Sequence, residues 1–332
     1  MDQKWVKSRL IDWAQKAGLG LDIDDTDIQY IWNPGGFVNQ SYQISDEKKH
    51  LHVKFAKRDH QPKLQQWARH HKYLTEHYQA PMLVMDIHES VIPDHPYGLV
   101  FEFFSGEVWE NQAWTDEIFL KVSQLHGDQK LKRMLGAAEK RCADAFVGTY
   151  IRRFREDMKI IDANREILSF VEKENFDWFH DVTDQLEEEV LHSPHFDRPA
   201  DDVVHNDLNQ QNILVNSDGF CMIDWDDLTL GDGAADYASL LWPWVYTEEW
   251  SMWEERVRVL AGDERFERMG LYFKAKLLDG IIDVLADYVE AEEFPDVKER
   301  TQHRAKVTHL HALELYKKNA LWYSSISDRS KG

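Results

Sequence analysis

The sequence predicts an α+β protein in which a small antiparallel-sheet lobe precedes a larger, mostly helical lobe. Between residues 27 and 104, short runs of alternating apolar and polar side chains predominate, which is typical of strands. Beyond residue 105, apolar side chains recur at helical spacing over long stretches, at about 145–192 and 264–320. Strands followed by helices in this order are typical of α+β folds.

The elements of the first lobe are predicted from local periodicity. Residues 1–17 have apolar side chains close to helical spacing, which indicates an amphipathic helix that caps a sheet. An antiparallel meander follows, with one strand ending at Trp32, a turn that contains two glycines, and a strand through Tyr42. A third strand alternates over 51–55, a helix at 64–74 packs on the sheet, and further strand-like runs end near Phe104.

The second lobe begins where the alternating pattern nearly disappears. Ser105 and Gly106 mark the best boundary, so we expect lobes at 1–105 and 106–332. Within the second lobe, two short apolar runs flank the turn at 216–219, which predicts a β-hairpin among helices. Helical periodicity then resumes near Ala234.

Composition narrows the class of protein. The chain has 332 residues, with 60 acidic against 39 basic side chains and a formal charge of −21, which argues against nucleic acid as a partner. An acidic surface also serves solubility alone. Cys142 and Cys221 form neither a disulfide framework nor a cysteine zinc site, and no leader or 18-residue apolar run is present. We therefore expect a cytoplasmic protein without a membrane partner.

The segment VVHNDLNQQNILVNSDGFCMIDWD, residues 203–226, contains the chemically informative residues. His205, Asp207 and Asn212 lie in one loop, and the following hairpin leads to Asp224. In kinases, an Asp and an Asn at these offsets orient the acceptor hydroxyl and hold metal, and an Asp after the next hairpin bridges metal to the phosphates. A purely structural turn, in which Asp and Asn cap backbone amides, would use the same residue types.

This segment resembles the superfamily of aminoglycoside phosphotransferases and choline kinases. The resemblance extends from about residue 28 to 242, and it includes Val53-Lys54, the run LVFEFFSGE at 99–107 and the run GAADYASL at 233–240. It implies a two-lobed protein-kinase-like fold, with a nucleotide-binding lobe at 1–105 and a catalytic and substrate-binding lobe at 106–332. The implied activity is transfer of the γ-phosphate of ATP, with Mg²⁺, to a hydroxyl of a small molecule.

The resemblance also implies roles for individual residues. Asp207 would be catalytic, His205 would support the catalytic loop, and Asn212 and Asp224 would hold metal. Asp236 would be a scaffold carboxylate for the same loop. The expected nucleotide-binding residues are Lys54 at the α and β phosphates, Gly35 and Gly36 in a phosphate loop, and the backbone from Glu102 to Phe104 at adenine.

Two departures from the kinase pattern keep alternatives open. Kinases pair the strand lysine with a glutamate on the next helix, but residues 61–75 contain no acidic side chain, so a catalytically silent nucleotide- or partner-binding protein is one alternative. A protein kinase is another, although the chain after Asp226 is too short for a peptide-docking segment. Residues 242–255 are rich in Trp and Glu, which suits either a cationic acceptor, such as an amino sugar or amino alcohol, or simple core packing.

Overall fold

The computed structural model describes residues 3–22, 24–31, 39–110, 113–138 and 140–329. The chain forms two compact units. Unit 1 comprises Met1–Ile118 and Gln210–Leu228, and unit 2 comprises Phe119–Asn209 and Thr229–Gly332. The lobes predicted at 1–105 and 106–332 from the change of sequence pattern stay a prediction.

Unit 1 contains a five-stranded sheet whose neighbouring strands all run antiparallel, in the order β1-β2-β3-β5-β4. The predicted meander is therefore confirmed. The strands are β1 (Asp27–Ile31), β2 (Asn39–Ser45), β3 (His50–Ala56), β4 (Leu83–Ile87) and β5 (Tyr97–Glu102).

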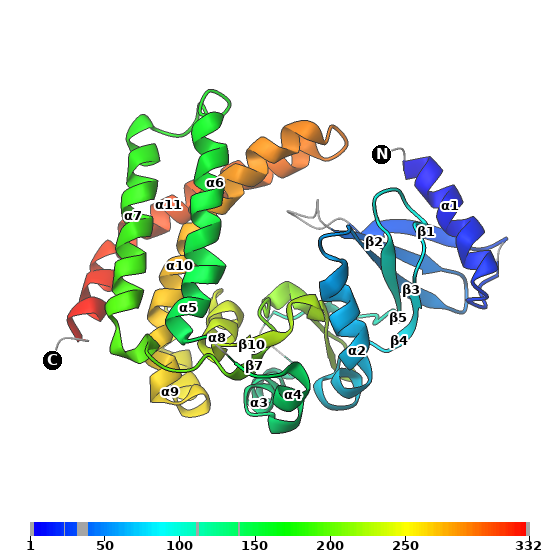
Figure 1. Ribbon diagram of the computed structural model, residues 1–332, viewed down its shortest axis with the longest axis horizontal. Helices are drawn as coiled ribbons and strands as arrows, with labels where there is room; N and C mark the ends of the chain where they lie inside the picture. The colour runs from blue at the N-terminus through cyan, green and yellow to red at the C-terminus, as the bar shows by residue number, and fades with distance from the viewer. Residues whose placement is uncertain (1–2, 23, 32–38, 111–112, 139, 330–332) are drawn as a thin grey trace. The chain divides into compact units, whose positions relative to one another are not determined.

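Helices α1 (Gln3–Lys16) and α2 (Gln61–Tyr78) cover opposite faces of this sheet (Figure 1). The apolar core on the α1 side includes Val6, Leu10 and Trp13 of the helix and Ile28, Tyr42 and Val53 of the strands. On the α2 side, the Trp67 ring stacks on Phe101 with 4.3 Å between centroids. Because side chains alternate along a strand, Lys54 of β3 points to this second face, where it is only 5% exposed.

The predicted hairpin is also confirmed, and it belongs to unit 1. Strands β8 (Ile213–Val215) and β9 (Phe220–Met222) pair with each other, and β6 (Glu107–Val108) extends them to three strands. At the turn, the Asn216 Oδ1 atom accepts hydrogen bonds from the backbone amides of Asp218 and Gly219, at 2.9 and 3.1 Å. Such an Asx turn explains why these residue types form a tight connection.

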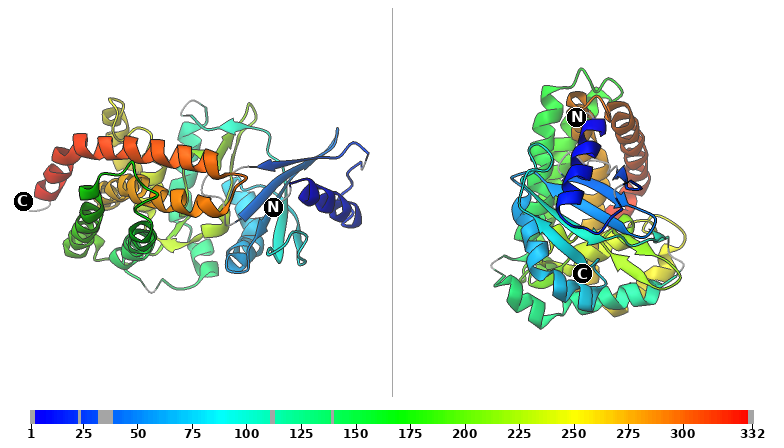
Figure 2. Two further views of the ribbon diagram at one scale, coloured as in Figure 1. Left: turned by 90° about the horizontal axis from the view of Figure 1, so that it is seen from above. Right: turned by 90° about the vertical axis from the view of Figure 1, so that its right-hand side faces the viewer.

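Unit 2 is helical, with one small pair of strands, β7 (Asp202–Val204) and β10 (Thr229–Gly231). The longest described helices are α10 (Asp263–Glu290) and α11 (Lys298–Arg329), which run side by side (Figure 2). The other α-helices of this part are α4 (Gln129–Leu135), α5 (Cys142–Phe146), α6 (Arg152–Ala163), α7 (Lys173–His192), α8 (Gly233–Leu241) and α9 (Trp250–Ala261), together with α3 (Thr115–His126), whose first turn belongs to unit 1. A π-helical turn, Val147–Ile151, joins α5 to α6.

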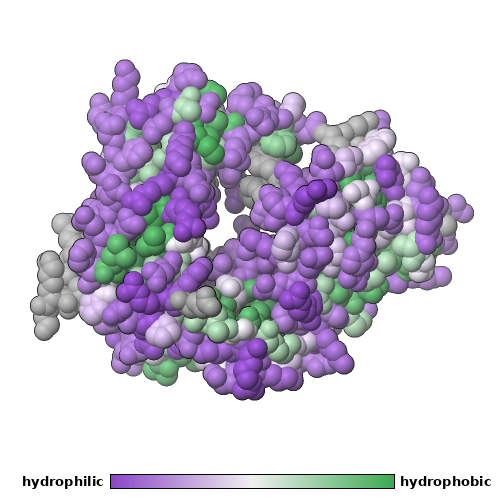
Figure 3. Space-filling view, viewed as in Figure 1, coloured by the Kyte–Doolittle hydropathy of each residue, from purple (hydrophilic) through white to green (hydrophobic). Residues whose placement is uncertain are grey.

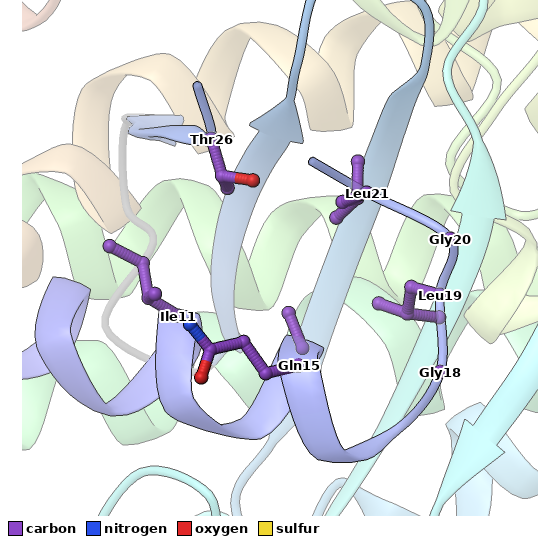
Figure 4. Close-up of a pocket in the computed structure, with 8 residues that line it drawn as sticks. Ile11, Gln15, Gly18, Leu19, Gly20, Leu21 and Thr26 are labelled. Atoms are coloured by element: carbon purple, nitrogen blue, oxygen red, sulfur yellow. The ribbon is translucent and has the colours of Figure 1, made fainter. Parts of the chain in front are cut away.

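The surface of the described residues is that of an ordinary globular protein (Figure 3), and a small pocket lies in unit 1. The visible face is mostly hydrophilic, as Figure 3 shows for a chain with 30% charged residues. A pocket of about 50 Å³ lies between α1 and residues 18–21, lined mainly by small and apolar residues (Figure 4). This volume holds about one or two waters, so it is far too small for a nucleotide. In the described part of the chain, no helix is both long and apolar enough to cross a bilayer.

Candidate active site

The hairpin of unit 1 brings Asn212 and Asp224 to the same end of its two strands. Ile213 lies opposite Met222, and the amide of Ile223 donates a hydrogen bond to the Asn212 carbonyl at 2.9 Å. Asp224 follows directly and adopts a left-handed conformation, with φ at 68°. A non-glycine residue in this conformation is uncommon and tends to occur at functional sites. The predicted metal ligands therefore lie on adjoining chain segments.

Lys54 reaches the same end of the hairpin from β3. Its ammonium group pairs with the Asp224 carboxylate and with Asp226, whose oxygens lie 3.0 and 3.1 Å from Nζ. The Asn39 side-chain amide donates a hydrogen bond to Asp226 Oδ2 at 3.2 Å. The Trp67 ring of α2 lies 5.8 Å from the ammonium, a cation–π distance. Strands β2 and β3, helix α2 and the hairpin thus all contribute to one cluster.

The cluster combines one ammonium group with two carboxylates. Burial lowers the pKa of Lys54, but the charges of Asp224 and Asp226 outweigh burial and raise it above the ordinary lysine value, so the side chain stays protonated. Burial and the Asp224 charge raise the pKa of Asp226 to about 6, against the opposing effect of Lys54. Excess negative charge in a buried place favours a further cation.

The donors present fit a magnesium ion that is shared with phosphate groups. Mg²⁺ prefers hard oxygen ligands, and it is commonly held by one or two protein side chains together with substrate phosphates and water. Asn212 and Asp224 offer an amide and a carboxylate oxygen of this kind. Among the described residues, no three His, Cys, Asp or Glu side chains gather to hold a metal on protein ligands alone.

The loop that contains His205 and Asp207 belongs to unit 2 and is held by a buried carboxylate. Asp236 of α8 accepts hydrogen bonds from the backbone amides of His205 and Asn206, at 2.9 and 2.8 Å. Its Oδ2 atom also lies 3.1 Å from His126 Nε2. Asp236 thus holds two consecutive amides directly before the bond about which Asn206 takes a φ of 68°. The scaffold role predicted for this residue is confirmed by these contacts.

Within this loop, the His205 ring supports the backbone. The ring is fully buried, and its Nδ1 atom lies 3.4 Å from the amide nitrogen of Asp207, which donates to it. The Asp207 carboxylate accepts a hydrogen bond from the Asn209 side chain at 3.0 Å. These bonds fix the orientation of the Asp207 side chain, a prerequisite for a residue that must receive or orient a proton.

Two other parts of the chain are predicted to bind the nucleotide, a pair of glycines and the end of β5. Gly35 and Gly36 lie outside the described residues. Glu102 ends β5, and its amide donates to the Met82 carbonyl at 2.9 Å, so that amide is already used. Phe104 follows two residues later and is partly exposed. The adenine-binding role of this backbone stays a prediction.

The structure also reveals contacts that spacing arguments missed. Asp226 forms an ion pair with Lys54, which the sequence had left without an acidic partner. The Asn39 side chain donates a hydrogen bond to Asp226 in turn. The only signal in the sequence is the second acidic residue of the run IDWD, two positions after Asp224. Nothing in local periodicity connects Asn39 with a residue 187 positions away.

Two tryptophans of the Trp-rich segment at 242–255 are used for packing. Trp244 and Trp253 are buried, and their rings stack with 4.8 Å between centroids. The Arg256 guanidinium already lies over the Trp253 ring, at 5.3 Å. Glu248 and Glu249 are exposed. These two indole rings therefore belong to the core of unit 2, whereas a cation-binding role for the rest of the segment stays a prediction.

A family model matches the sequence of this chain, and several solved structures share its fold. Residues 32–272 match the model of the phosphotransferase enzyme family. A choline kinase from Cryptosporidium parvum Iowa II is 17% identical, with a TM-score of 0.57 and 96% of each chain covered. Wild-type aminoglycoside 2'-phosphotransferase-IIIa, in its GDP complex, is 13% identical, with a TM-score of 0.59 over 92% of this chain and 99% of that one.

A spectinomycin phosphotransferase in complex with ADP and spectinomycin is 14% identical, with a TM-score of 0.57 and 98% of each chain covered. At such identities the likeness shows the fold, which confirms the predicted two-part kinase-like architecture. The family match covers well over half of the sequence. The chain therefore belongs to the phosphotransferase enzyme family, within the superfamily of kinase-like small-molecule phosphotransferases to which its sequence bears a resemblance.

Proposed function

We propose that this enzyme uses ATP and Mg²⁺ to phosphorylate a hydroxyl group of a small molecule. The main support is the cluster of Lys54, Asp224 and Asp226 beside Asn212, because it combines a fixed cation with oxygen donors and excess negative charge. The complexes of similar proteins with GDP and ADP also support nucleotide binding. We assign Lys54 to the phosphates, and Asn212 and Asp224 to the metal.

The proposed chemistry assigns one proton transfer to Asp207. The acceptor oxygen forms a bond to the γ-phosphorus, the bond from that phosphorus to the β–γ bridging oxygen breaks, and the nucleoside diphosphate leaves. The hydroxyl proton passes to the Asp207 carboxylate, which the Asn209 amide holds at 3.0 Å. Magnesium, when bound with the nucleotide, would neutralise phosphate charge. His205 positions the loop rather than transferring a proton.

We further propose that residues 1–105 serve nucleotide binding and residues 106–332 serve catalysis and acceptor binding, in the cytoplasm. Both cysteines are buried as free thiols, which suits a reducing compartment.

A small acceptor is favoured over a protein acceptor. Only Leu228 lies between the turn at Trp225–Asp227 and strand β10, and α8 begins at Gly233. This short connection leaves no length for the extended segment with which protein kinases dock peptides. An amino sugar or amino alcohol remains one acceptor class to test, although the buried rings of Trp244 and Trp253 are not available to bind it.

The reason for considering a catalytically silent protein was the lack of an acidic partner for Lys54. Helix α2 lacks the glutamate that pairs with this lysine in kinases, but Lys54 instead pairs with two carboxylates that follow the hairpin. Magnesium-dependent release of ADP in the presence of any small hydroxyl acceptor would exclude the silent alternative.

The test of the proposed function is the substitution Asp207→Asn. Loss of a positioned general base typically lowers turnover by about 10²- to 10⁴-fold, so we expect a loss in that range with nucleotide affinity retained. Turnover is measured as ADP release with a panel of amino alcohols, amino sugars and hydroxy amino acids. Asp181→Asn, an exposed position on α7, is the matched control and should behave as wild type. Unchanged turnover of Asp207→Asn would rule out the assignment.

A further inference from the structure

Lys276 of α10 lies beside the loop of Asp207, and the proposed function gives it no role. Its Nζ atom donates a hydrogen bond to the Ser239 hydroxyl at 3.1 Å. Ser239 lies one helical turn after Asp236 on α8, so both side chains are on the same face of that helix. Asp236 in turn holds the backbone amides of His205 and Asn206. Lys276 and the catalytic loop are therefore both hydrogen-bonded to the same face of α8, within unit 2.

The electrostatic surroundings of Lys276 agree with this placement. Burial lowers its pKa below the ordinary lysine value; the Asp207 and Asp236 charges oppose that effect, and the Arg153 guanidinium adds to it. The charged groups that face the ammonium therefore come from the catalytic loop, from α8 and from α6. Tyr150 lies in the same region, because Asp207 and Asp236 also act on its hydroxyl.

Lys276 differs from its neighbours in having no ion-pair partner among the described residues. Two positions earlier on α10, Lys274 pairs with both oxygens of Glu189, at 2.8 and 2.9 Å. Arg153 pairs with Asp279 and lies 3.6 Å from Asp283. Lys276 uses one of its three donors, on a neutral hydroxyl. A partly buried ammonium group that pairs directly with no carboxylate of the described residues is costly, and a bound anion would reduce that cost.

We propose that Lys276 binds an anionic group of the acceptor, a carboxylate or a phosphate monoester, and that the enzyme therefore selects anionic hydroxyl compounds. This inference rests on the proposed function, because it takes Asp207 as the residue that orients the acceptor hydroxyl. A lysine ammonium is a compact charge with rotatable donors, which suits a carboxylate or phosphate in either orientation. Hydroxy amino acids and hydroxy acids meet this requirement, whereas simple amino alcohols do not.

The experiment compares acceptors that differ only in charge. ADP release is measured with L-serine, L-homoserine and D-glycerate and with the carboxamide of each, for wild type and for Lys276→Met, Lys276→Arg and Lys274→Met. Wild type should prefer the acids. Lys276→Met should raise KM for the acids roughly tenfold or more, as expected for a charge-assisted hydrogen bond, and should change KM for the carboxamides little. Lys276→Arg should restore part of the preference, and Lys274→Met should keep all of it.

A pH series gives a second readout, which a merely structural lysine would not produce. The ammonium must be protonated to bind an anion, and its pKa is lowered. KM for the acids should therefore rise with pH, starting below the ordinary lysine range, in wild type but not in Lys276→Arg. The carboxamides should show no such rise.

Other outcomes overturn the inference. Equal use of acids and carboxamides by wild type, use of none of the acids, or an equal loss with both sets in Lys276→Met would each do so. A fall in kcat alone would instead assign Lys276 to the transferred phosphoryl group. The proposed function is judged separately: it fails if Asp207→Asn keeps wild-type turnover, whichever acceptor is preferred.

Discussion

At the scale of single residues, Lys54 shows what the sequence could and could not reveal. Its position on a strand with Leu51, Val53 and Phe55 on the other face was predictable from alternation alone. Its partners were not, because Asp224 lies 170 residues away in the chain. Residues 61–75 of helix α2 contain no acidic side chain, and its Trp67 ring lies beside the ammonium, so the carboxylates come from the segment that follows the hairpin.

Lys54→Met tests this pairing. The change leaves Asp224 and Asp226 close together without an ammonium group, and breaking a buried pair in this way typically costs about 3 kcal/mol or more. We expect a lower melting temperature without ligand and at least tenfold weaker binding of Mg-nucleotide, measured by calorimetry. Lys54→Arg keeps the charge and should retain part of both properties. Unchanged nucleotide affinity in Lys54→Met would contradict the assigned role.

At the scale of elements, the sequence predicted the regular parts best. The expected helix at 64–74 lies inside α2, and the hairpin appears where two apolar runs flank an Asn-containing turn. Interruptions of the long helical stretches were harder to predict. Helix α6 ends at Ala163, where the Asn164 side chain donates to the Ile160 carbonyl at 2.8 Å and so competes with helical bonding. Such competition depends on backbone geometry that periodicity does not contain.

The packing of α6 on α10 buries a carboxyl group whose pKa is raised. Asp157 of α6 is only 9% exposed, and its Oδ2 atom has no hydrogen-bond partner in the described part of the chain. Burial, together with the charges of Asp283, Asp287 and Glu290, raises its pKa to about 7. The pKa of Asp287 is likewise raised to about 7, again mainly by burial. At neutral pH this helix interface therefore lies near the midpoint of its titration.

This titration predicts a pH-dependent stability. Between about pH 4 and pH 7 the folded state binds more protons than the unfolded state, because the folded pKa exceeds the unfolded value, so the free energy of unfolding falls as pH rises. Asp157→Asn removes one such group and should be more stable than wild type above pH 7, by about 1 kcal/mol or more. Urea unfolding at pH 5, 6, 7 and 8 measures how the free energy of unfolding changes with pH in wild type and in Asp157→Asn. If the slope is the same in wild type and variant, the interface does not titrate as described; Asp181→Asn should keep the wild-type slope.

At the scale of the whole molecule, the two units are not consecutive halves of the sequence. Residues Gln210–Leu228 join unit 1 because β8 pairs with β6 and the Met222 amide donates to the Gln79 carbonyl at 3.1 Å. The sequence predicted one boundary at residue 105, because composition changes there. Pairing between segments more than a hundred residues apart leaves no periodic trace, so the interleaving had to come from the structure.

Independent cores in the two units lead to a prediction about unfolding. In unit 2, Arg268 makes a bidentate pair with Asp232, with both distances 2.6 Å, and the Tyr272 hydroxyl donates to the same carboxylate at 3.1 Å. Asp232 and Arg268 are both nearly fully buried. Asp232→Asn keeps the oxygen that accepts from the Ala234 amide at the start of α8 but leaves the guanidinium without a counterion.

We therefore expect Asp232→Asn to lower the stability of unit 2 by about 3 kcal/mol while leaving unit 1 nearly unchanged. Hydrogen exchange followed by mass spectrometry should become faster in peptides from α8 and α10 but not in those from β1 to β5, and Mg-nucleotide affinity should stay within about twofold of wild type. Asp263→Asn, which loses only an exposed pair with Arg258, should change neither. Faster exchange of equal size in both units would mean that they unfold as one, because a defect confined to one independent core cannot open the other.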